Sequence, residues 1–340
     1  DYRLSFYEQI ASVPEYDVTV LHSGKIMRKP DSNFREIIVP ENFFTRILWQ
    51  KGALNNAQNA DVVIALFDVH YLSTIFLGLL PRKFKLIFWG IGFGKSRVAN
   101  HIRLFLARKA DALALYMPGN MRDFTDNGIP SSKIFCTPNT IHIENPFFNE
   151  NIMEKDHFLF LGGLKKRKKI DEFIMAFKKA LPSFTRPVHM DIIGEGEMMV
   201  NLKYKVNHLA LNDFVTFHGA ITDNEKLAPF FRRAIAIVSP GQAGLTILHG
   251  FAHGVPMVTY RHAISGGELE NIVHGTNGIL YGGSVNELTS VLIKLANNSE
   301  HAHILGRNAY EYYINEMTLN HLITSFKKII DFVQRKGNGQ

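Results

Sequence analysis

The stretch SPGQAGLTILHGFAHGVPMV, residues 239–258, has the layout of a strand end, a glycine-containing turn and a short helix. The apolar run RAIAIV before it predicts a buried strand, and Gly241 and Gly244 permit a tight turn into a helix over about residues 245–252. The free N–H groups and positive dipole end at the start of such a helix favour a bound anion, such as a phosphate. The alternative is an ordinary strand-to-helix connection in which the glycines only allow close packing.

Strand-like apolar runs alternate with helix-length amphipathic stretches along the chain, in two series. The first series is DVTVLH, DVVIAL, KLIFWG, ALALYM and KIFCTP, and the second is HFLFLGG, HMDIIG, FVTFHG, AIAIVSP and VPMVTY. Such alternation predicts parallel sheets with helices on both faces, and two series predict two sheets. Asn and Pro cluster without periodicity in residues 141–156, which is typical of a linker. We expect an α/β protein with domains at 1–150 and 151–316, followed by a terminal segment, 317–340.

The composition indicates a soluble globular protein, because 46% of the 340 residues are hydrophobic and 20% are charged. No apolar run approaches membrane-spanning length, and residues 1–10 lack the layout of a signal peptide, so we expect a cytoplasmic location. The single cysteine, Cys136, excludes an internal disulfide, and we expect a buried, inert thiol. The net charge of +7 is spread over both halves, which argues against a nucleic-acid partner.

Basic and apolar residues are mixed in residues 77–85 and 101–109, as in segments that lie on a membrane surface. The segment 317–336 predicts an amphipathic helix, because its apolar residues stand mainly at helical spacing: Leu319, Leu322, Ile323, Phe326, Ile329, Ile330 and Phe332. An anionic membrane surface is a candidate partner for its basic residues, Lys327, Lys328, Arg335 and Lys336. Peripheral attachment to the inner face of the cell membrane is therefore one interpretation, and core-facing helices with a solvated basic side are the other.

Five segments of the second half occur in an order that resembles a known enzyme family. They are FLGGLKKRKKIDEFIMAF, DIIGEGE, VTFHGAITDNEKLAPFFRRA, VSPGQAGLTILHGFAHGVPMV and ELENIVHGTNGIL. In this order they resemble the C-terminal half of the retaining GT-B glycosyltransferases of family four, also called glycosyl transferases group 1. The resemblance is strong over residues 158–285 and covers the N-terminal half only in outline.

The resemblance implies a GT-B fold, in which two Rossmann-like, doubly wound parallel-sheet domains face each other across a cleft. It implies a metal-independent, hexosyltransferase-like enzyme without a cofactor, whose donor is a UDP- or GDP-linked sugar held mainly by the C-terminal domain. The implied acceptors are bacterial polysaccharides, lipopolysaccharides and lipid-linked glycans. In relatives the final helix crosses back onto the N-terminal domain, and we expect the same here.

The glycine-containing turn is implied to receive the donor diphosphate or sugar through Gly241, Gln242, Gly244, Leu245 and Thr246. The family motif begins with one glutamate and ends eight residues later with a second, and these positions align with Gly241 and His249. Both carboxylates are therefore missing. We expect His249 to hydrogen-bond a ribose hydroxyl through a ring nitrogen, and a packed side chain is the alternative.

The basic run KKRKK follows the first strand of the second series and aligns with a family motif that contains a lysine. We expect Lys168 to stabilise charge on the leaving diphosphate, with Gly163 and Arg167 beside the donor. The resemblance implies that His218 flanks the nucleotide base and that Glu270 faces the donor. Because both motif glutamates are missing, we expect Glu270 or Glu268 to supply a carboxylate. A solvated charge run and a surface pair of glutamates are the alternatives.

The N-terminal domain is implied to receive the acceptor, with Tyr2, Arg3, Trp89 and Gly90 as candidate contacts. Ile91 stands about where many relatives carry a histidine. The family's retaining reaction is described as a front-face substitution in which the leaving phosphate helps to deprotonate the acceptor, so no general base is assigned. No His, Cys or carboxylate residues stand at metal-ligand spacing, and we expect no metal site.

Two other functions remain open beside a glycosyltransferase of surface polysaccharide or lipopolysaccharide assembly. A nucleotide-sugar 2-epimerase shares the double Rossmann-like architecture but needs acid and base groups and no acceptor groove. A non-catalytic nucleotide-sugar-binding relative is consistent with the loss of both motif glutamates. Turnover of a nucleotide sugar, with and without an acceptor, distinguishes the three.

Overall fold

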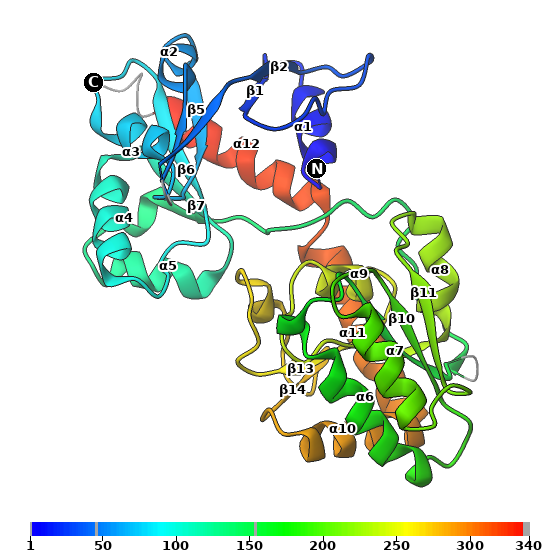
Figure 1. The fold of residues 1–340 in the computed structure, drawn as a ribbon. Coiled ribbons are helices and arrows are strands. Elements are labelled where there is room, and N and C mark those ends of the chain that lie inside the picture. The colour runs from blue at the N-terminus through cyan, green and yellow to red at the C-terminus, as the bar shows by residue number, and fades with distance from the viewer. Residues whose placement is uncertain (1, 45–46, 153–154, 336–340) are drawn as a thin grey trace. The chain divides into compact units, whose positions relative to one another are not determined.

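The computed structural model describes residues 2–44, 47–152 and 155–335, and the chain divides into two compact units (Figure 1). Unit 1 comprises residues 1–142 and 319–340, and unit 2 comprises Ile143–Thr318. The division precedes the expected boundary at residue 150, because the intervening segment is bonded into unit 2. The Phe147 N–H donates to the Ala252 carbonyl oxygen at 3.0 Å.

Unit 1 contains a parallel sheet in the order β5-β6-β7-β8, a parallel pair, β1-β2, and an antiparallel hairpin, β3-β4. The hairpin was not predicted by the alternation of strands and helices. The helices and strands of unit 1 are α1 (Leu4–Ala11), β1 (Thr19–His22), β2 (Arg35–Ile38), β3 (Glu41–Phe44), β4 (Ile47–Gln50), α2 (Ala53–Ala57), β5 (Val62–Leu66), α3 (Leu72–Leu79), β6 (Lys85–Gly90), α4 (Arg97–Lys109), β7 (Ala112–Leu115), α5 (Pro118–Thr125), β8 (Ile134–Cys136) and α12 (Leu319–Arg335).

Helix α12 packs into the core of unit 1, although it is distant from the rest of the unit in sequence. Its amphipathic pattern places one face inward: Leu319, Leu322, Ile323, Phe326, Ile329, Ile330 and Val333 are buried. The Phe326 ring lies 5.0 Å from the Trp89 ring of β6 and 5.2 Å from the Phe6 ring of α1, between ring centroids. The apolar face of α12 is thus used for packing. Lys336 lies outside the described residues.

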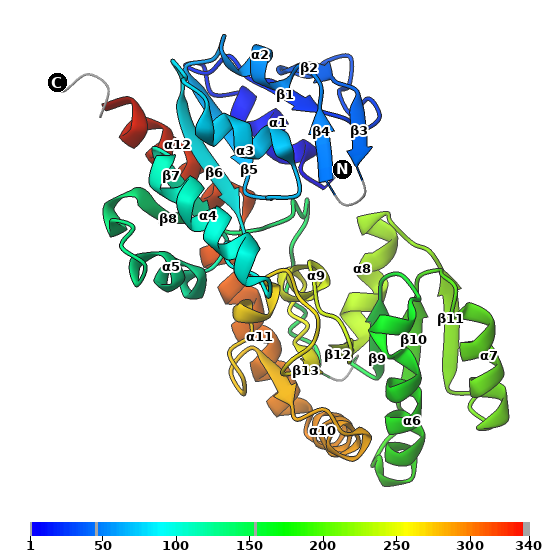
Figure 2. The same cartoon turned by 60° about the vertical axis from the view of Figure 1, so that its left-hand side comes forward.

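Unit 2 is built on one six-stranded parallel sheet in the order β11-β10-β9-β12-β13-β14 (Figure 2). Its helices and strands are β9 (His157–Leu161), α6 (Ile170–Ala180), β10 (His189–Ile193), α7 (Met199–His208), β11 (Val215–Gly219), α8 (Asn224–Arg233), β12 (Ala234–Val238), α9 (Thr246–Ala252), β13 (Met257–Tyr260), β14 (Gly278–Tyr281), α10 (Val285–Asn297) and α11 (Ser299–Glu316). The predicted α/β fold with parallel sheets is confirmed.

Alternate residues of the central strands of unit 2 point to opposite faces of the sheet. Phe158 and Phe160 of β9 enter a buried cluster with Phe173 and Phe177 of α6. The intervening positions of β9 and β10 face the other side and include His157 and the buried Asp191. Burial on both faces is the reason that these strands are nearly continuous apolar runs, and a buried carboxylate in such a run needs polar partners.

The exposure of Cys136 corrects the prediction of a buried thiol. Cys136 ends β8, and β8 is the last strand in its sheet, so its side chain reaches the surface rather than the core. Across residues 2–44, 47–152 and 155–335, no helix is both long and apolar enough to cross a membrane.

Candidate functional site

The loops that follow β9 and β12 meet at the carboxyl edge of the unit 2 sheet. Numbered in chain order from β9, the strands lie in the order 3-2-1-4-5-6. Strands β10 and β11 follow on one side of β9, whereas β12, β13 and β14 lie on its other side, so the strand order reverses between the neighbours β9 and β12. In open parallel sheets, ligands bind at the carboxyl ends of the strands at this reversal. The Gly241 N–H donates to the Lys168 carbonyl oxygen at 3.0 Å, so the two loops hold each other at this position.

The Lys168 side chain is half-buried between these loops. Its Nζ donates to the Gln242 carbonyl oxygen at 3.3 Å, and Arg167 Nε donates to Gln242 Oε1 at 2.8 Å. Burial lowers the pKa of Lys168, the neighbouring Arg167 lowers it further, and Glu268 opposes the shift. A partly desolvated ammonium group beside a second cation gains stability from a bound anion.

The two glutamates expected at the donor site differ in burial. Glu268 is 8% exposed, and its Oε2 accepts hydrogen bonds from Ser265 Oγ at 3.0 Å and from the Gly266 N–H at 2.8 Å. Its charge acts on Lys168. Glu270 is exposed in the same short 3-10 helix, η5 (Glu268–Asn271). Of the two, Glu268 is therefore the buried carboxylate, and its charge acts to raise the pKa of Lys168.

Gly241 is required because no side chain fits at its position. A Cβ built there would overlap the carbonyl oxygen of Arg167 and lie 2.8 Å from Lys169 Cγ. A Cβ built at Gly244 would have no atom within 4 Å. The glutamate that begins the family motif therefore cannot occupy position 241 in this loop arrangement, whereas position 244 tolerates a side chain.

We expect Gly241→Ala to lower the free energy of unfolding by about 1–3 kcal/mol, the usual range for overpacking a tight contact. Gly244→Ala is the matched control and should change it by less than about 0.5 kcal/mol. Urea unfolding followed by circular dichroism measures both. Equal free energies of unfolding for the two variants would show that the loops after β9 and β12 can move apart to admit a methyl group without loss of stability.

His249 of α9 is half-buried, and its Nδ1 is buried without a hydrogen-bond partner in the described part of the chain. Burial lowers the pKa of His249 to about 4, and the adjacent His253 contributes to the shift. His253 is 3% exposed, stacks on the Phe231 ring at 4.3 Å and bonds the His249 carbonyl oxygen through Nδ1 at 2.7 Å. His253 is thus a packed residue, while His249 keeps an unused ring nitrogen.

The lowered pKa of His249 predicts a loss of stability in acid. The unfolded chain binds a proton at the ordinary pKa of 6.5 and the folded chain only near pH 4, so stability falls as the pH drops through this interval. At about 1.4 kcal/mol per pKa unit, the loss is up to about 3 kcal/mol. His249→Gln should abolish this component in unfolding experiments between these pH values. If the free energy of unfolding of the His249→Gln protein fell between these pH values as much as that of the unaltered protein, the loss of stability would belong to other groups.

His218, expected beside the nucleotide base, lies on β11 with its Nε2 2.7 Å from Asp191 Oδ1. Its ring meets the Phe230 ring edge-on at 4.6 Å. Asp191 is 6% exposed and was not predicted as a site residue. The only signal for it was a single carboxylate within the apolar run HMDIIG, because a buried carboxylate usually has a partner.

The four acceptor-side candidates belong to unit 1, where two of them are buried. Trp89 is 4% exposed within the core, and a Cβ at the buried Gly90 would lie 3.0 Å from Phe67 Cβ. These positions indicate packing roles for Trp89 and Gly90. Tyr2 is exposed, and the Arg3 guanidinium lies 4.2 Å from the Trp89 ring centroid and 5.2 Å from that of Tyr2.

Arg3 is also fixed by Tyr116, to whose hydroxyl its Nη2 donates at 2.6 Å. Tyr2 and Arg3 are therefore the acceptor-side candidates that retain an exposed or polar surface. Of the remaining donor candidates, Gly163 and Leu245 stand in the two loops and Thr246 begins α9. Thr246 Oγ1 donates to the Leu161 carbonyl oxygen at 3.4 Å.

The structure brings together ligand-type side chains that the sequence spacing does not reveal. Asp156, His157 and His189 each offer one ligand atom, and these atoms lie within 4.8 Å of one another. Sequence spacing predicted no metal site, and it misses this cluster because pairing of β9 with β10 brings His189 opposite His157.

The six-stranded parallel sheet of unit 2 has the strand order of a Rossmann-like unit, and two of its loops are hydrogen-bonded to each other at the strand-order reversal. A family model described as glycosyl transferases group 1 matches residues 142–312, half of the chain. The chain belongs to this family.

Three similar proteins extend the comparison. Alpha-monoglucosyldiacylglycerol synthase of Streptococcus pneumoniae is 25% identical over 181 residues, covering 48% of this chain and 39% of the relative. Sucrose-phosphate synthase from Thermosynechococcus elongatus has a TM-score of 0.71 at 15% identity, covering 98% of this chain and 92% of that one. Alr3699/HepE of Anabaena, solved in complex with UDP, has a TM-score of 0.64 at 16% identity, covering 82% and 80% of the two chains.

These likenesses to solved structures concern the fold, which is of the GT-B type with two Rossmann-like units. The chain spans less than half the length of the curated relatives that it matches.

Proposed function

We propose that this chain transfers a sugar, with retention of anomeric configuration, from a nucleotide diphosphate sugar to a glycan or lipid-linked acceptor. The observation that carries the proposal is the position of Lys168, held by the Gln242 carbonyl oxygen at the strand-order reversal of a group 1 family member. The fold likeness to a protein solved with UDP supports a UDP-linked donor.

In the proposed complex, the diphosphate lies against Lys168 and Arg167 and the turn that begins at Gly241. Negative charge grows on the leaving phosphate as the glycosidic bond breaks, and a fixed, partly desolvated cation stabilises that charge more than water does. Glu268 supplies the carboxylate beside this cation. The unpartnered Nδ1 of His249 bonds a ribose hydroxyl, and the reaction needs no metal ion.

The proposal is tested by incubating the purified chain with UDP- and GDP-linked sugars and measuring nucleotide release, with and without glycan or lipid acceptors. Acceptor-dependent release with an α-configured product from an α-configured donor supports a retaining transferase. Conversion of the donor sugar without an acceptor would indicate a 2-epimerase instead. Binding of UDP without turnover of any donor would indicate a non-catalytic relative.

A lipid-linked acceptor is supported by the exposed apolar and basic surface of α3 and α4. The exposed side chains include Phe76, Leu79 and Phe105, which are 36%, 46% and 46% exposed. Lys109 Nζ lies 5.9 Å from the Phe105 ring centroid. We propose that this surface, rather than α12 with its buried apolar face, contacts an anionic membrane.

In co-sedimentation at low salt, the chain should bind anionic vesicles more than neutral ones. Phe105→Ser should weaken this binding, because it removes an exposed ring that can enter the headgroup region. Equal binding to anionic and neutral vesicles would contradict the membrane proposal while leaving the transferase proposal untouched.

A further inference from the structure

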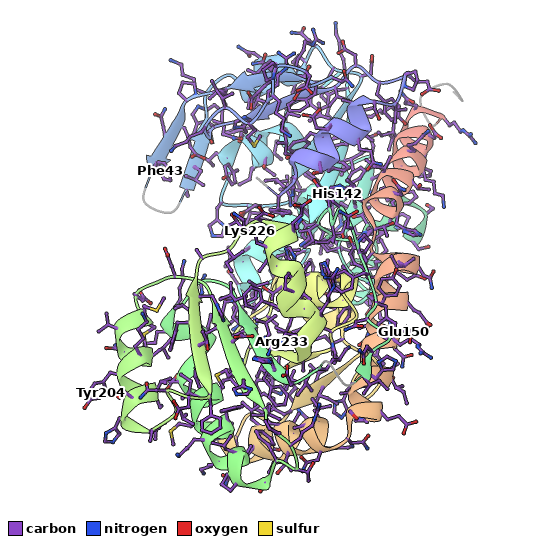
Figure 3. All side chains as sticks on the ribbon, turned by 90° about the vertical axis from the view of Figure 1, so that its right-hand side faces the viewer. Phe43, His142, Glu150, Tyr204, Lys226 and Arg233 are labelled. Atoms are coloured by element: carbon purple, nitrogen blue, oxygen red, sulfur yellow. The ribbon has the colours of Figure 1, made fainter. Side chains whose placement is uncertain are left out.

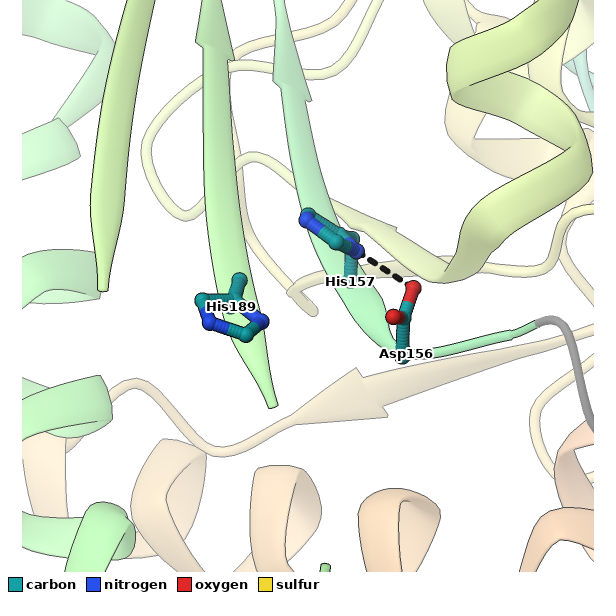
Figure 4. Close-up of side chains that lie close together, drawn as sticks. All are labelled: Asp156, His157 and His189. Carbon is teal, nitrogen blue, oxygen red and sulfur yellow. Dashed lines mark hydrogen bonds and ion pairs between the residues drawn. The ribbon is translucent and has the colours of Figure 1, made fainter. Parts of the chain in front are cut away.

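Three potential metal ligands meet at the amino-terminal ends of β9 and β10, as Figure 4 shows. Asp156 directly precedes β9, His157 is its first residue, and His189 is the first residue of β10. The parallel register pairs His157 with His189, and their ring centroids lie 5.1 Å apart. His157 Nδ1 lies 2.5 Å from Asp156 Oδ1. Two imidazoles and one carboxylate are a ligand set that suits zinc and similar ions.

A second carboxylate lies behind this cluster. Asp191 is 6% exposed, and its Oδ2 lies 3.9 Å from His157 Nε2, on the side of the ring away from Nδ1. Metal-binding histidines usually direct their second ring nitrogen at a carboxylate, which fixes the ring and raises its basicity. The other oxygen of Asp191 is held by His218 Nε2 at 2.7 Å. Asp191 thus stands where it can become the outer partner of His157 once a metal ion occupies Nδ1 and Arg233 leaves Nε2.

His189 has an unused nitrogen. Its Nδ1 is buried and has no hydrogen-bond partner among the residues that the structure describes. Buried polar atoms nearly always have a hydrogen-bond partner or a ligand, so the unpartnered His189 Nδ1 indicates a bound group. The ring is flanked by His157 at 5.1 Å and by Phe214 at 6.2 Å, between centroids. These neighbours restrict its movement and keep the nitrogen close to the other two ligands.

We propose that Asp156, His157 and His189 bind one divalent transition-metal ion of the zinc type, with water as the fourth ligand. The ion joins the starts of two adjacent strands. This edge of the sheet is opposite to the one that carries the Lys168 loop, since parallel strands begin at one edge and end at the other. The site is therefore structural, and its test does not depend on sugar transfer.

Arg233 is the competitor of the metal ion. It ends α8 and is labelled in Figure 3. Its Nη2 lies 3.2 Å from His157 Nε2, and its Nε lies 3.3 Å from Asp156 Oδ1. The side chain is 53% exposed and so can move away. Without metal, the Arg233 guanidinium neutralises Asp156. When the metal ion binds, the guanidinium leaves. The proton on His157 then lies on Nε2, which faces Asp191, because the metal ion occupies Nδ1.

The experiment uses the full chain without an affinity tag, treated with a chelator and titrated with Zn²⁺ against a chromophoric competitor. We expect one equivalent of Zn²⁺ to bind. His189→Phe should weaken the Zn²⁺ affinity by about 100-fold or more, because loss of a direct ligand costs more than the 10- to 100-fold typical for loss of an outer partner. Phenylalanine keeps a ring against Phe214 but carries no ligand atom. The matched control is His208→Phe on α7, where the ring stacks on Tyr204 at 6.1 Å outside the cluster.

Two further variants make the test specific to this site. Arg233→Gln should strengthen Zn²⁺ binding several-fold, because it removes the competing charge. Asp156→Asn should weaken Zn²⁺ binding, and it covers the case in which His189→Phe does not fold, as judged by circular dichroism. Co²⁺ should give the intense visible absorption of a tetrahedral site. Failure to bind one equivalent, or equal affinity in the His189→Phe and His208→Phe proteins, would overturn the proposal.

Discussion

Replacing Lys168 with alanine is expected to lower kcat/KM for the nucleotide sugar by about 100- to 1,000-fold, the usual effect of removing one preorganised group that stabilises developing charge. The ammonium is half-buried and held at 3.3 Å by the Gln242 carbonyl oxygen, so its position is fixed before the bond breaks. Water that replaces it must reorient during the reaction. Steady-state kinetics with the donor found in the substrate screen measure the loss.

Lys166→Ala is the matched control in the same basic run. The Lys166 side chain is exposed, and its backbone N–H donates to Glu197 Oε1 at 3.3 Å. We expect less than a threefold change in kcat/KM, because an exposed charge is screened by water and salt. UDP should raise the melting temperature of the Lys166→Ala protein as in the parent and that of Lys168→Ala less. Equal losses in both variants would mean that the run acts only through its total charge.

Replacing Phe326 with alanine is expected to lower the free energy of unfolding of unit 1 by about 3–5 kcal/mol, the range for deleting a buried phenylalanine. Phe326 is fully buried and contacts the rings of Trp89 and Phe6. The deletion leaves a cavity that these rings fill only in part. Urea unfolding followed by tryptophan fluorescence measures the effect on unit 1 alone, because both tryptophans of the chain, Trp49 and Trp89, belong to it.

Phe105→Ala is the control for the loss of a phenyl ring in the same unit. Phe105 is 46% exposed on α4, so its removal opens no cavity. A change of about 0.5 kcal/mol or less is expected without lipid present. If Phe326→Ala were as mild as Phe105→Ala, α12 would not be a part of the cooperative core of unit 1.

Some of the candidate site was open to prediction from the sequence and some was not. The Lys168 loop and the Gly241 turn were predictable, because each directly follows an apolar strand and the carboxyl ends of parallel strands lie at one edge. The different burial of Glu268 and Glu270 was not, because both stand in one short turn and exposure depends on what packs against it. The burial of Trp89 likewise depends on α12, which is far away in sequence.

The sequence by itself determined the alternation of strands and helices, the order of the loops and the amphipathic pattern of α12. Each is a periodicity over neighbouring residues, fixed by local backbone geometry. Only the tertiary structure decided that His189 lies beside His157, that Asp191 holds His218, and that position 241 has no room for a side chain. Parallel pairing joins strands separated by a whole helix, and its register is set by packing of the complete sheet, which no local spacing records.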